Sequence, residues 1–545
     1  MLKPSLKTKE IFCVLGIILF AGLIRIPSLT QPLGPDQGIM SVIGEGILHG
    51  KLPYKDFWEM GSPAIFFTYA LMFKIFGISM STIPIMDTLV SMLTTFLIFL
   101  LSKSLWDNKV GYVSALLFAF FSNGVRLGMH ASGDIAFGTF WYIAQRETFM
   151  LPLIVASIYF IIGSERDEKH FWRLFLSGFL AGLTFVYKFP ALLIFFCLLL
   201  YLNYGVLTND VQSKASLFVK KNLILVSGFI LSLIPFVLFF YYKGALKGMT
   251  DVIFGYVSSV YGQLDHNYLG IIKLALLRTY FIATENFILW IFFIASSIYI
   301  ILKEPIKENF LVIIWGIASF LFIALHREFF GYHYLLVLPP FSILAGYGLV
   351  KSLGPNLNFK KIFTEEFGKL FIIGTLFVNL AFFTTLNYMH YTKFYYYITG
   401  KITKETYYGF FNAYPKHDYS FPADYKVAQY IEKNTNSSDK IYALGGIESV
   451  IYFLTKRKSP SRFIFSWILF SKTHGQVKQA ERYRQELLSD LKAKIPKYII
   501  IIQSLKKFER FPGIYNFIRT HYALKKTFPD DRLLYAHINH KNDRL

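Results

Sequence analysis

The side chains best suited to chemistry lie in the polar segments that separate the apolar runs of this sequence. The first such segment opens with Gly34–Gly38 (GPDQG), where the carboxylate of Asp36 follows a proline and is flanked by glycines. Long connections rich in Gly, Pro, acids and aromatics usually carry function. Asp36 therefore has two interpretations: a solvated turn residue after Pro35, or a general base that takes a proton from a reacting hydroxyl.

The second polar segment, residues 124–147, ends at the start of another apolar run. Glu147 opens that run, and an acid in the first turn of a helix also has a purely structural use, because it interacts favourably with the helix dipole. Two acids in two such segments nevertheless suggest a shared site, and we expect Arg126 to contact the substrate there. The other ionisable residues of the segment are His130, Asp134 and Arg146.

A single lysine stands between two later apolar runs. Lys188 lies in Tyr187–Pro190 (YKFP), and Pro190 must end any helix that reaches it. A lysine at a membrane interface can simply extend its ammonium group to water while its stem stays in apolar surroundings. The functional interpretation is a point charge that holds a phosphate.

The segment His326–Tyr334 (HREFFGYHY) contains two histidines, two tyrosines, an arginine and a glutamate in a compact turn. Its histidine spacing matches no zinc signature, so we expect His326, Arg327, His333 and Tyr334 to contact a phosphate or a sugar rather than a metal. The only two cysteines, Cys13 and Cys197, lie inside apolar runs and give no thiol site. The sequence thus predicts no required cofactor, and a divalent cation has no clear ligand set.

Composition identifies the elements that must position these residues. Of 545 residues, 54% are hydrophobic, which is too apolar for an ordinary soluble enzyme and excludes disorder. The formal net charge of +22 fits cations at the ends of membrane helices, where they face anionic lipid. We therefore expect a polytopic α-helical membrane protein without a nucleic-acid partner.

Apolar runs long enough to cross a bilayer recur along the first 388 residues. We expect about eleven transmembrane helices, and up to thirteen. The count varies by two because Val110–Asn123 and Leu174–Tyr187 are short for a span. The expected spans are Ile11–Leu29, Ile83–Leu101, Val110–Asn123, Thr148–Ile162, Leu174–Tyr187, Ala191–Leu207, Leu223–Tyr242, Tyr280–Leu302, Phe310–Leu325, Tyr334–Val350 and Leu370–Leu386.

The distribution of Lys and Arg predicts the orientation. Basic residues are denser in the connections that share a side with the N-terminus, which places that terminus in the cytoplasm of a multi-pass cell-membrane protein. We divide the chain into a membrane domain, 1–388, with a large first extracytoplasmic loop at 30–82, and an extracytoplasmic soluble α/β domain, 389–545. Its expected helices and strands are Tyr425–Lys433, Lys440–Leu444, Gln476–Lys492, Tyr498–Ile502 and Leu533–Ile538, and Phe463–Phe470 has the length of a strand or a core segment.

Three motifs in the right order give the chain a family resemblance. Gly34–Gly38 followed by Leu48–Trp58 (LHGKLPYKDFW), the glycine-rich run Gly178–Lys188, and His333–Pro340 (HYLLVLPP) resemble bacterial GT-C membrane glycosyltransferases. These are the relatives of protein O-mannosyltransferases and lipid A aminoarabinose transferases. The resemblance covers roughly residues 11–350. It implies a polyprenyl-phosphate-linked sugar donor and inverting transfer, on the outer face, to an acceptor hydroxyl of a protein, lipid or glycan.

The resemblance also implies roles for individual residues. The family's loop acid, its second-loop acid and its phosphate-facing lysine fall on Asp36, Glu147 and Lys188. The chain departs from many relatives at two positions. Gln37 stands where they have a second acid beside Asp36, and Gly61-Ser62-Pro63 stands where they have a basic residue before the prolines. Lys55 is then the candidate substitute for that cation, and we also count Tyr54 as a substrate contact.

Two other classes of protein fit part of the pattern. A lipid or solute transporter (including a flippase) also carries ionisable groups in its membrane region, but usually near the middle of the bilayer and on broken helices. Here the charged candidates gather at the ends of the apolar runs. A polysaccharide polymerase or ligase would use similar lipid-linked sugars and fits the same charge layout. The charge pattern therefore favours enzymes that use lipid-linked sugars over transporters.

Overall fold

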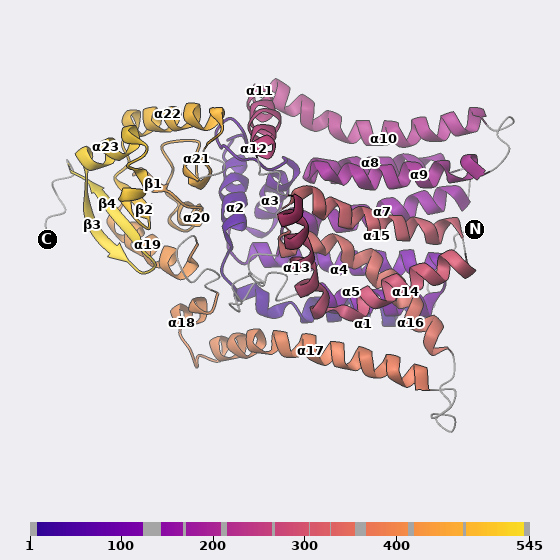
Figure 1. Ribbon diagram of the computed structural model, residues 1–545. Coiled ribbons are helices and arrows are strands. Elements are labelled where there is room, and N and C mark those ends of the chain that lie inside the picture. The colour runs from indigo at the N-terminus through magenta and orange to yellow at the C-terminus, as the bar shows by residue number, and fades with distance from the viewer. Residues whose placement is uncertain are drawn as a thin grey trace.

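A bundle of long helices carries a small α/β domain at one end (Figure 1). The computed structural model describes residues 8–123, 143–166, 170–208, 215–263, 268–304, 306–327, 329–354, 367–411, 419–471 and 476–538. The long helices of the bundle are α1 (Thr8–Leu23), α4 (Thr82–Leu105), α5 (Asn108–Phe121), α7 (Arg146–Arg166), α8 (Phe171–Tyr187), α9 (Leu192–Thr208), α10 (Ala215–Tyr242), α13 (Tyr268–Glu285), α14 (Phe287–Lys303), α15 (Lys307–His326), α16 (Leu338–Leu353) and α17 (Phe367–Ile398).

The bundle is built from membrane-spanning helices. Within the described residues, seven helical stretches are long and apolar enough to cross a bilayer, or eight if one bent pair counts as a span. Four shorter apolar helices accompany them. Helices suit this environment because they satisfy their own backbone hydrogen bonds where water is absent. The chain is therefore a multi-pass membrane protein, and the count of about eleven spans stays a prediction.

One predicted span is wrong as a single straight helix. The apolar run Tyr280–Leu302 is divided between α13 and α14, which are bent by 102° at Asn286. The reason is a polar contact from α17. Asn379 Oδ1 accepts the Ile288 N–H at 3.1 Å, and its amide nitrogen donates to the Glu285 carbonyl at 2.9 Å. Those backbone groups are thus satisfied at the break, and hydropathy cannot detect it.

Glycines explain how closely α8 and α10 pack. A Cβ at Gly178 would lie 2.0 Å from the Leu225 carbonyl oxygen, and one at Gly228 would lie 2.1 Å from the Phe175 carbonyl oxygen. Only glycine permits backbones to approach this closely, which is a common basis of helix pairing in membranes. The glycine-rich run before Lys188 therefore fixes the helix that ends at that lysine.

Two helices fill the first polar segment, between the bundle and the α/β domain (Figure 1). After the short turn η1 (Ile26–Thr30) come α2 (Pro35–Leu48) and α3 (Ala64–Phe76). Pro35 occupies the first helical position, where its missing N–H costs nothing. Asp36 thus lies in the first turn of a helix rather than in an irregular loop.

The C-terminal domain contains a four-stranded sheet of order β1-β2-β4-β3. Strands β1 (Ile441–Leu444) and β2 (Tyr498–Ile502) are parallel, whereas β4 (Arg532–His537) runs antiparallel to both β2 and β3 (Tyr522–Phe528). The remaining helices and turns are α11 (Leu246–Thr250), η3 (Asp251–Tyr256), α12 (Val257–Gln263), η2 (Phe189–Ala191), η4 (Gly331–Val337), α18 (Lys404–Gly409), α19 (Phe421–Asn434), α20 (Val450–Thr455), α21 (Trp467–Phe470), α22 (Lys478–Ala493), η7 (Leu505–Phe508) and α23 (Pro512–His521).

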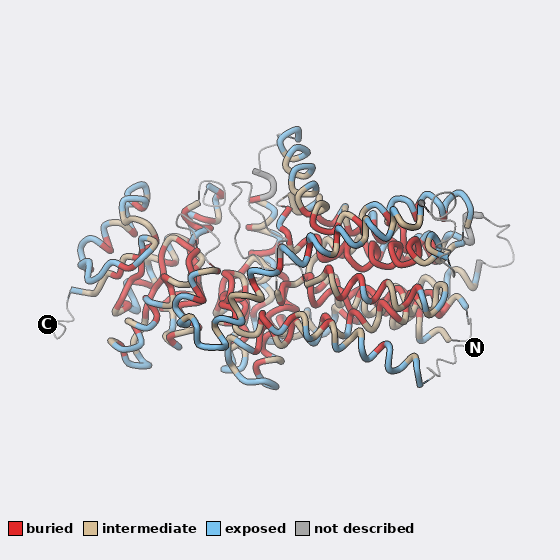
Figure 2. The backbone as a smooth tube through the Cα atoms, turned by 90° about the horizontal axis from the view of Figure 1, so that it is seen from below, coloured by how far each residue is buried: buried red, intermediate tan, exposed pale blue. Residues whose placement is uncertain are grey.

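The C-terminal domain packs directly against the first polar segment. Trp58 is fully buried, and its ring contacts Phe463, Phe465 and Tyr483 at centroid distances of 5.7–6.1 Å. The Trp58 N–H also donates to the Arg462 carbonyl at 2.9 Å. Buried backbone accordingly runs from the bundle through this segment into the domain (Figure 2). The division of the chain at residue 388 stays a prediction, and α17 continues past it to Ile398.

Candidate active site

Asp36 lies half-buried at the end of the bundle that faces the C-terminal domain. The Gln145 side-chain amide donates to Asp36 Oδ2 at 3.3 Å. Burial raises the pKa of the Asp36 carboxyl above its ordinary value, while the positive charge of Arg146 and the bond from Gln145 oppose that rise. A carboxylate with a raised pKa and a partly open surface can act as a proton acceptor.

Glu147 and Lys188 form a buried ion pair next to it. Glu147 lies in the first turn of α7 and is 1% exposed, and Lys188 follows the last residue of α8. Lys188 Nζ lies 2.5 Å from Glu147 Oε1. His333 Nε2 lies 3.8 Å from the same oxygen, so η4 contributes a third group. The structure thus brings Asp36 and Glu147, the two acids expected to share a site, close together, with Lys188 beside them.

Arg146 binds the segment between α2 and α3. Its Nη2 lies 3.4 Å from Glu59 Oε1, and the same oxygen accepts the Gly61 N–H at 2.9 Å. A Cβ at Gly61 would lie 1.8 Å from Arg146 Nη2, so the guanidinium fills the space that a side chain would need. Burial raises the pKa of the Glu59 carboxyl, and Arg146 opposes that rise.

The predicted histidines lie on the side of the cluster next to Lys188. The rings of His326 and His333 are 4.7 Å apart between centroids. Lys188 Nζ also lies over the rings of Phe322 and Tyr332, at 5.5 Å and 5.8 Å. Such aromatic faces attract a cation. The end of α15 and η4 therefore form an aromatic and imidazole wall around the ammonium group.

Other predicted contacts lie elsewhere. Tyr334 is buried, and its hydroxyl pairs with Thr279 of α13 at 2.8 Å. Tyr54 is also buried, and its hydroxyl donates to the Gly61 carbonyl at 2.6 Å, so it shapes the Glu59–Gly61 turn. Arg327 is partly buried in a left-handed backbone conformation, with φ of 58°.

Lys55 is exposed, which does not suit the phosphate contact expected of it. The cation found against Gly61 is Arg146 instead. Arg126 lies outside the described residues, as do His130 and Asp134. A role for Arg126 therefore stays a prediction.

Three residues of the cluster had no role in the sequence prediction. Gln145 and Arg146 directly precede Glu147, and Glu59 directly follows the motif Leu48–Trp58. The run of three polar residues before an apolar helix is the signal that could have singled out the first two. Nothing in sequence spacing pairs Glu59 with Arg146, because 87 positions separate them.

The cluster offers charge and hydrogen bonds rather than a metal site. Among the residues that the structure describes, no group of three or more His, Cys, Asp and Glu side chains could hold a metal ion. The nearby charges are three carboxylates (Asp36, Glu59 and Glu147) and two cations (Arg146 and Lys188). This arrangement can accept a proton at one point and stabilise a developing negative charge at another.

Comparison with known proteins matches this fold and part of the sequence. Residues 61–242 match the family model of dolichyl-phosphate-mannose-protein mannosyltransferase, and residues 423–528 match that of the competence-induced protein Ccs4 C-terminal domain. The first match includes Arg146, Glu147 and Lys188 but not Asp36. A sequence comparison with curated proteins gives no match.

Two solved structures share the architecture along nearly the whole chain. ArnT from Cupriavidus metallidurans, bound to undecaprenyl phosphate, is similar with a TM-score of 0.54 and 11% identity, over 98% of this chain and 99% of that one. The apo oligosaccharyltransferase of Archaeoglobus fulgidus is similar with a TM-score of 0.52 and 13% identity, over 98% of this chain and 75% of that one.

The fold is thus that of the GT-C membrane glycosyltransferases. With the match to the mannosyltransferase family model, the chain is classed as a membrane glycosyltransferase similar to the mannosyltransferase and aminoarabinose transferase members of that class.

Proposed function

We propose that this protein transfers a sugar from a polyprenyl-phosphate donor to an acceptor hydroxyl, with inversion at the anomeric carbon and Asp36 as the general base. The single observation that supports this most is the cluster at the start of α7. There a half-buried carboxylate, Asp36, lies close to two cations, Arg146 and Lys188, at one end of an apolar bundle. A lipid-linked donor needs this combination of apolar helices and polar chemistry at the membrane surface.

The proposed reaction is a single displacement at the anomeric carbon. The acceptor hydroxyl oxygen attacks the anomeric carbon and passes its proton to the Asp36 carboxylate. The bond from that carbon to the phosphate oxygen breaks, and the lipid phosphate leaves with the electron pair. Attack opposite the leaving group inverts the configuration, and the transition state resembles the oxocarbenium ion of glycoside hydrolysis.

The surroundings of the carboxylates favour Asp36 over Glu147 as the base. Glu147 is 1% exposed and already paired with Lys188 at 2.5 Å, so its charge is neutralised within the cluster. Asp36 is partly open, and its pKa is raised by burial, which increases its affinity for the acceptor proton. Glu147 then orients Lys188, which in turn contacts the leaving phosphate.

We propose that Lys188 and Arg146 both face the donor phosphate. Each is already held by a carboxylate, so neither must be reoriented when negative charge develops on the leaving group. Preorganised cations of this kind are the main source of such electrostatic stabilisation. His326 and His333 then complete the wall on the Lys188 side.

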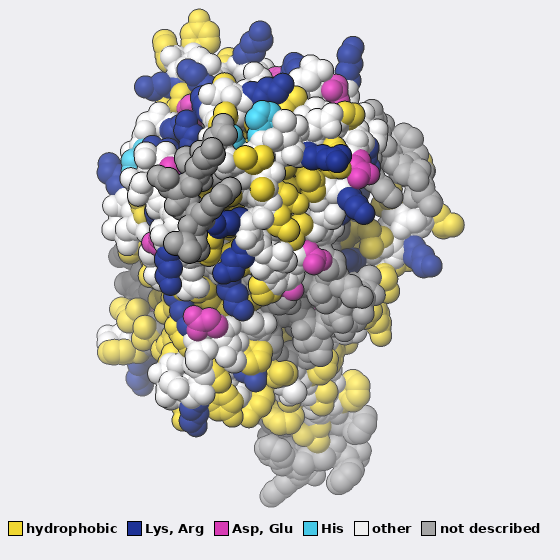
Figure 3. Space-filling view, turned by 90° about the vertical axis from the view of Figure 1, so that its left-hand side faces the viewer, with side chains coloured by type: hydrophobic (Ala, Val, Ile, Leu, Met, Phe, Trp, Pro, Cys, Tyr) yellow, Lys and Arg dark blue, Asp and Glu magenta, His cyan; other side chains and the backbone are white. Residues whose placement is uncertain are grey.

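For the orientation, we propose a cytoplasmic N-terminus and an extracytoplasmic C-terminal domain. The support is the density of Lys and Arg in the short connections at the far end of the bundle. The C-terminal domain also carries many Lys and Arg on its outer surface (Figure 3). That does not oppose the orientation, because folded domains are translocated largely regardless of charge.

The test is donor turnover by the purified protein. Incubation in detergent with a radiolabelled polyprenyl-phosphate sugar should release lipid phosphate only when an acceptor is added. A Glu45→Gln variant, altered on the same helix as Asp36 but in a surface pair with Lys456, is the matched control and should keep its activity. Movement of the intact labelled lipid across a liposome membrane without cleavage would support a transporter instead.

A further inference from the structure

The backbone just before α7 is held by polar side chains from three other helices. Asp87 Oδ1 of α4 accepts the Ala144 N–H at 2.8 Å, and the Tyr69 hydroxyl of α3 donates to the Ala144 carbonyl at 3.0 Å. The Gln37 amide of α2 donates to the Ile143 carbonyl at 2.8 Å. Two consecutive residues are thus fixed at three backbone atoms.

Ala144 needs this support because its backbone is strained. Its φ is +50°, in the left-handed region that alanine rarely adopts. Such conformations persist only where the surrounding structure imposes them, and they cluster at functional sites. Ala144 is fully buried, so its N–H also depends on Asp87 for a hydrogen bond.

The next three residues carry the side chains of the candidate site. Gln145 contacts Asp36, Arg146 pairs with Glu59, and Glu147 pairs with Lys188. A change of the Ala144 conformation would redirect all three side chains at once. The backbone contacts and the site contacts therefore belong to one continuous segment.

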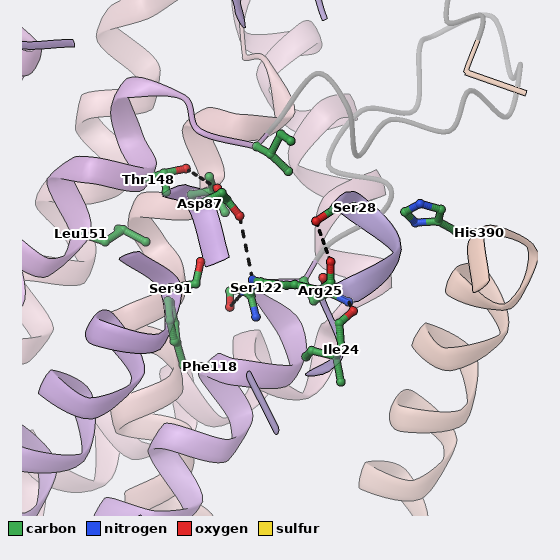
Figure 4. A pocket seen from close by; sticks show the side chains of 13 residues that line it. Ile24, Arg25, Ser28, Asp87, Ser91, Phe118, Ser122, Thr148, Leu151 and His390 are labelled. Atoms are coloured by element: carbon green, nitrogen blue, oxygen red, sulfur yellow. Dashed lines mark hydrogen bonds and ion pairs between the residues drawn. The ribbon is translucent and has the colours of Figure 1, made fainter. Parts of the chain in front are cut away.

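Asp87 is itself fixed from behind by Arg25. Arg25 Nε lies 4.0 Å from Asp87 Oδ2, and the Arg25 Nη2 donates to Ser122 at 2.7 Å. Figure 4 shows Asp87 between Arg25 on one side and Thr148 on the other, and Thr148 Oγ1 donates to Asp87 Oδ1 at 3.2 Å. A cavity of about 40 Å³ adjoins these groups, with room for ordered water.

We propose that Asp87 is a positioning residue for glycosyl transfer: its carboxylate holds Ala144 in the left-handed conformation and so places Gln145, Arg146 and Glu147 in the site. This inference rests on the proposed function. Asp87 acts through the Ala144 backbone and makes no contact with the substrate. The competing explanation is a buried ion pair with Arg25 that only stabilises the bundle.

The test compares Asp87→Ala and Asp87→Asn with a core variant, Ile158→Ala, which alters a buried residue of α7 away from the site. Asp87→Ala should lower single-turnover transfer by about 10²-fold, the loss expected when catalytic groups move by about an ångström. Asp87→Asn should keep most of the activity, because its amide oxygen can still accept the Ala144 N–H. Ile158→Ala should lose stability without this loss of transfer.

A second substitution tests the mechanism of the effect. Glycine adopts a φ of +50° freely, so Ala144→Gly in the Asp87→Ala background should restore transfer by about fivefold or more. The pH profile gives a further readout. Arg146 and Gln145 lower the pKa of Asp36 more than Glu147 raises it, so displacement of these three side chains in Asp87→Ala should shift the acidic limb of transfer to higher pH.

Normal transfer by folded Asp87→Ala would overturn the proposal, as would a loss that Ala144→Gly does not restore. If Asp87→Ala does not fold, Asp87→Asn is the deciding variant: a loss of transfer of tenfold or more there would contradict the proposal, because its amide oxygen can still accept the Ala144 N–H. Asp36→Asn is measured in parallel. If it transfers normally, the proposed base is wrong, yet the glycine rescue still tests the positioning, because Glu147, the partner of Lys188, depends on the same backbone.

Discussion

Gly61 offers a sharp test of whether Arg146 holds the donor phosphate. In Gly61→Ala the new Cβ would lie 1.8 Å from Arg146 Nη2, whereas ordinary contacts begin near 3.4 Å, so the guanidinium must move by roughly 1.5 Å. The backbone at Gly61 lies outside the left-handed region, so the substitution acts through this collision alone.

The expected size follows from the contact that is lost. A hydrogen bond to a charged group contributes about 1.5–3 kcal/mol, which is roughly a 10- to 150-fold weaker donor affinity. Arg146→Ala should weaken donor binding by the same amount. The double variant should bind no worse than either single variant, because both substitutions remove the same contact between Arg146 and the phosphate.

The assay is equilibrium binding of a polyprenyl-phosphate donor to the detergent-solubilised protein. Gly50→Ala is the control: it strains the same segment at a φ of +78° but has no heavy atom within 4 Å of the new Cβ. If Gly61→Ala binds donor normally, or if its loss adds fully to that of Arg146→Ala, the guanidinium does not hold the phosphate.

Four further outcomes are expected. Asp36→Asn keeps shape and hydrogen bonding but cannot take the proton, so single-turnover transfer should fall by about 10² to 10⁴ while donor binding persists; near-normal transfer would move the role of base to Glu147. Lys188→Ala should weaken donor binding by about 1.5–3 kcal/mol, and an unchanged affinity would mark the lysine as an interface anchor. The transfer rate should rise with pH as Asp36, whose pKa is raised, loses its proton. The hydrogen bond from Gln145 lowers that pKa, so Gln145→Leu should move the acidic limb of the pH profile to higher pH, and an acidic limb that does not move would exclude Asp36 as the titrating group. In a cysteine-free background, an impermeant maleimide should label Ser437→Cys but not Lys303→Cys in intact cells, and the opposite pattern would invert the proposed orientation.

Hydropathy predicted most helices of the bundle because a membrane span must be both long and apolar. It failed at the α13–α14 bend for a physical reason. Only Thr284, Glu285 and Asn286 interrupt the apolar run there, and the backbone at the bend is held by Asn379, a residue of another helix that is far away in sequence. Sequence periodicity contains no information on such a partner.

In the C-terminal sheet, too, only some of the strands could be predicted from the sequence. Strand β2 is a fully buried run of one tyrosine and four isoleucines and is easily predicted, whereas β3 lies at the edge of the sheet with its five central residues exposed. An edge strand that buries neither face lacks the alternation on which strand prediction depends. Its lysines, Lys525 and Lys526, are typical of edges protected against pairing with another chain.

For the site, sequence reasoning found the ionisable residues but only part of their pairing. Asp36, Glu147 and Lys188 stood out as charges at the ends of apolar runs, and the structure brings them into one cluster. Arg146 and Glu59 could not be paired, because their contact depends on how the segment between α2 and α3 packs against the start of α7. Their roles in catalysis stay predictions until variants are measured.

The C-terminal domain helps to position this site because it contacts the chain on both sides of Asp36, at Leu33 just before α2 and at Gly38 within α2. The Tyr419 hydroxyl donates to the Leu33 carbonyl at 2.6 Å, and a Cβ at Gly38 would lie 3.0 Å from the Val450 backbone nitrogen. Asp36 therefore sits between two points at which the domain touches the same short segment. A domain joined only by a linker could move without altering the carboxylate, whereas this one cannot shift along α2 without moving Leu33 or Gly38. The position of the candidate base is thus set jointly by the bundle, through Gln145, and by the C-terminal domain.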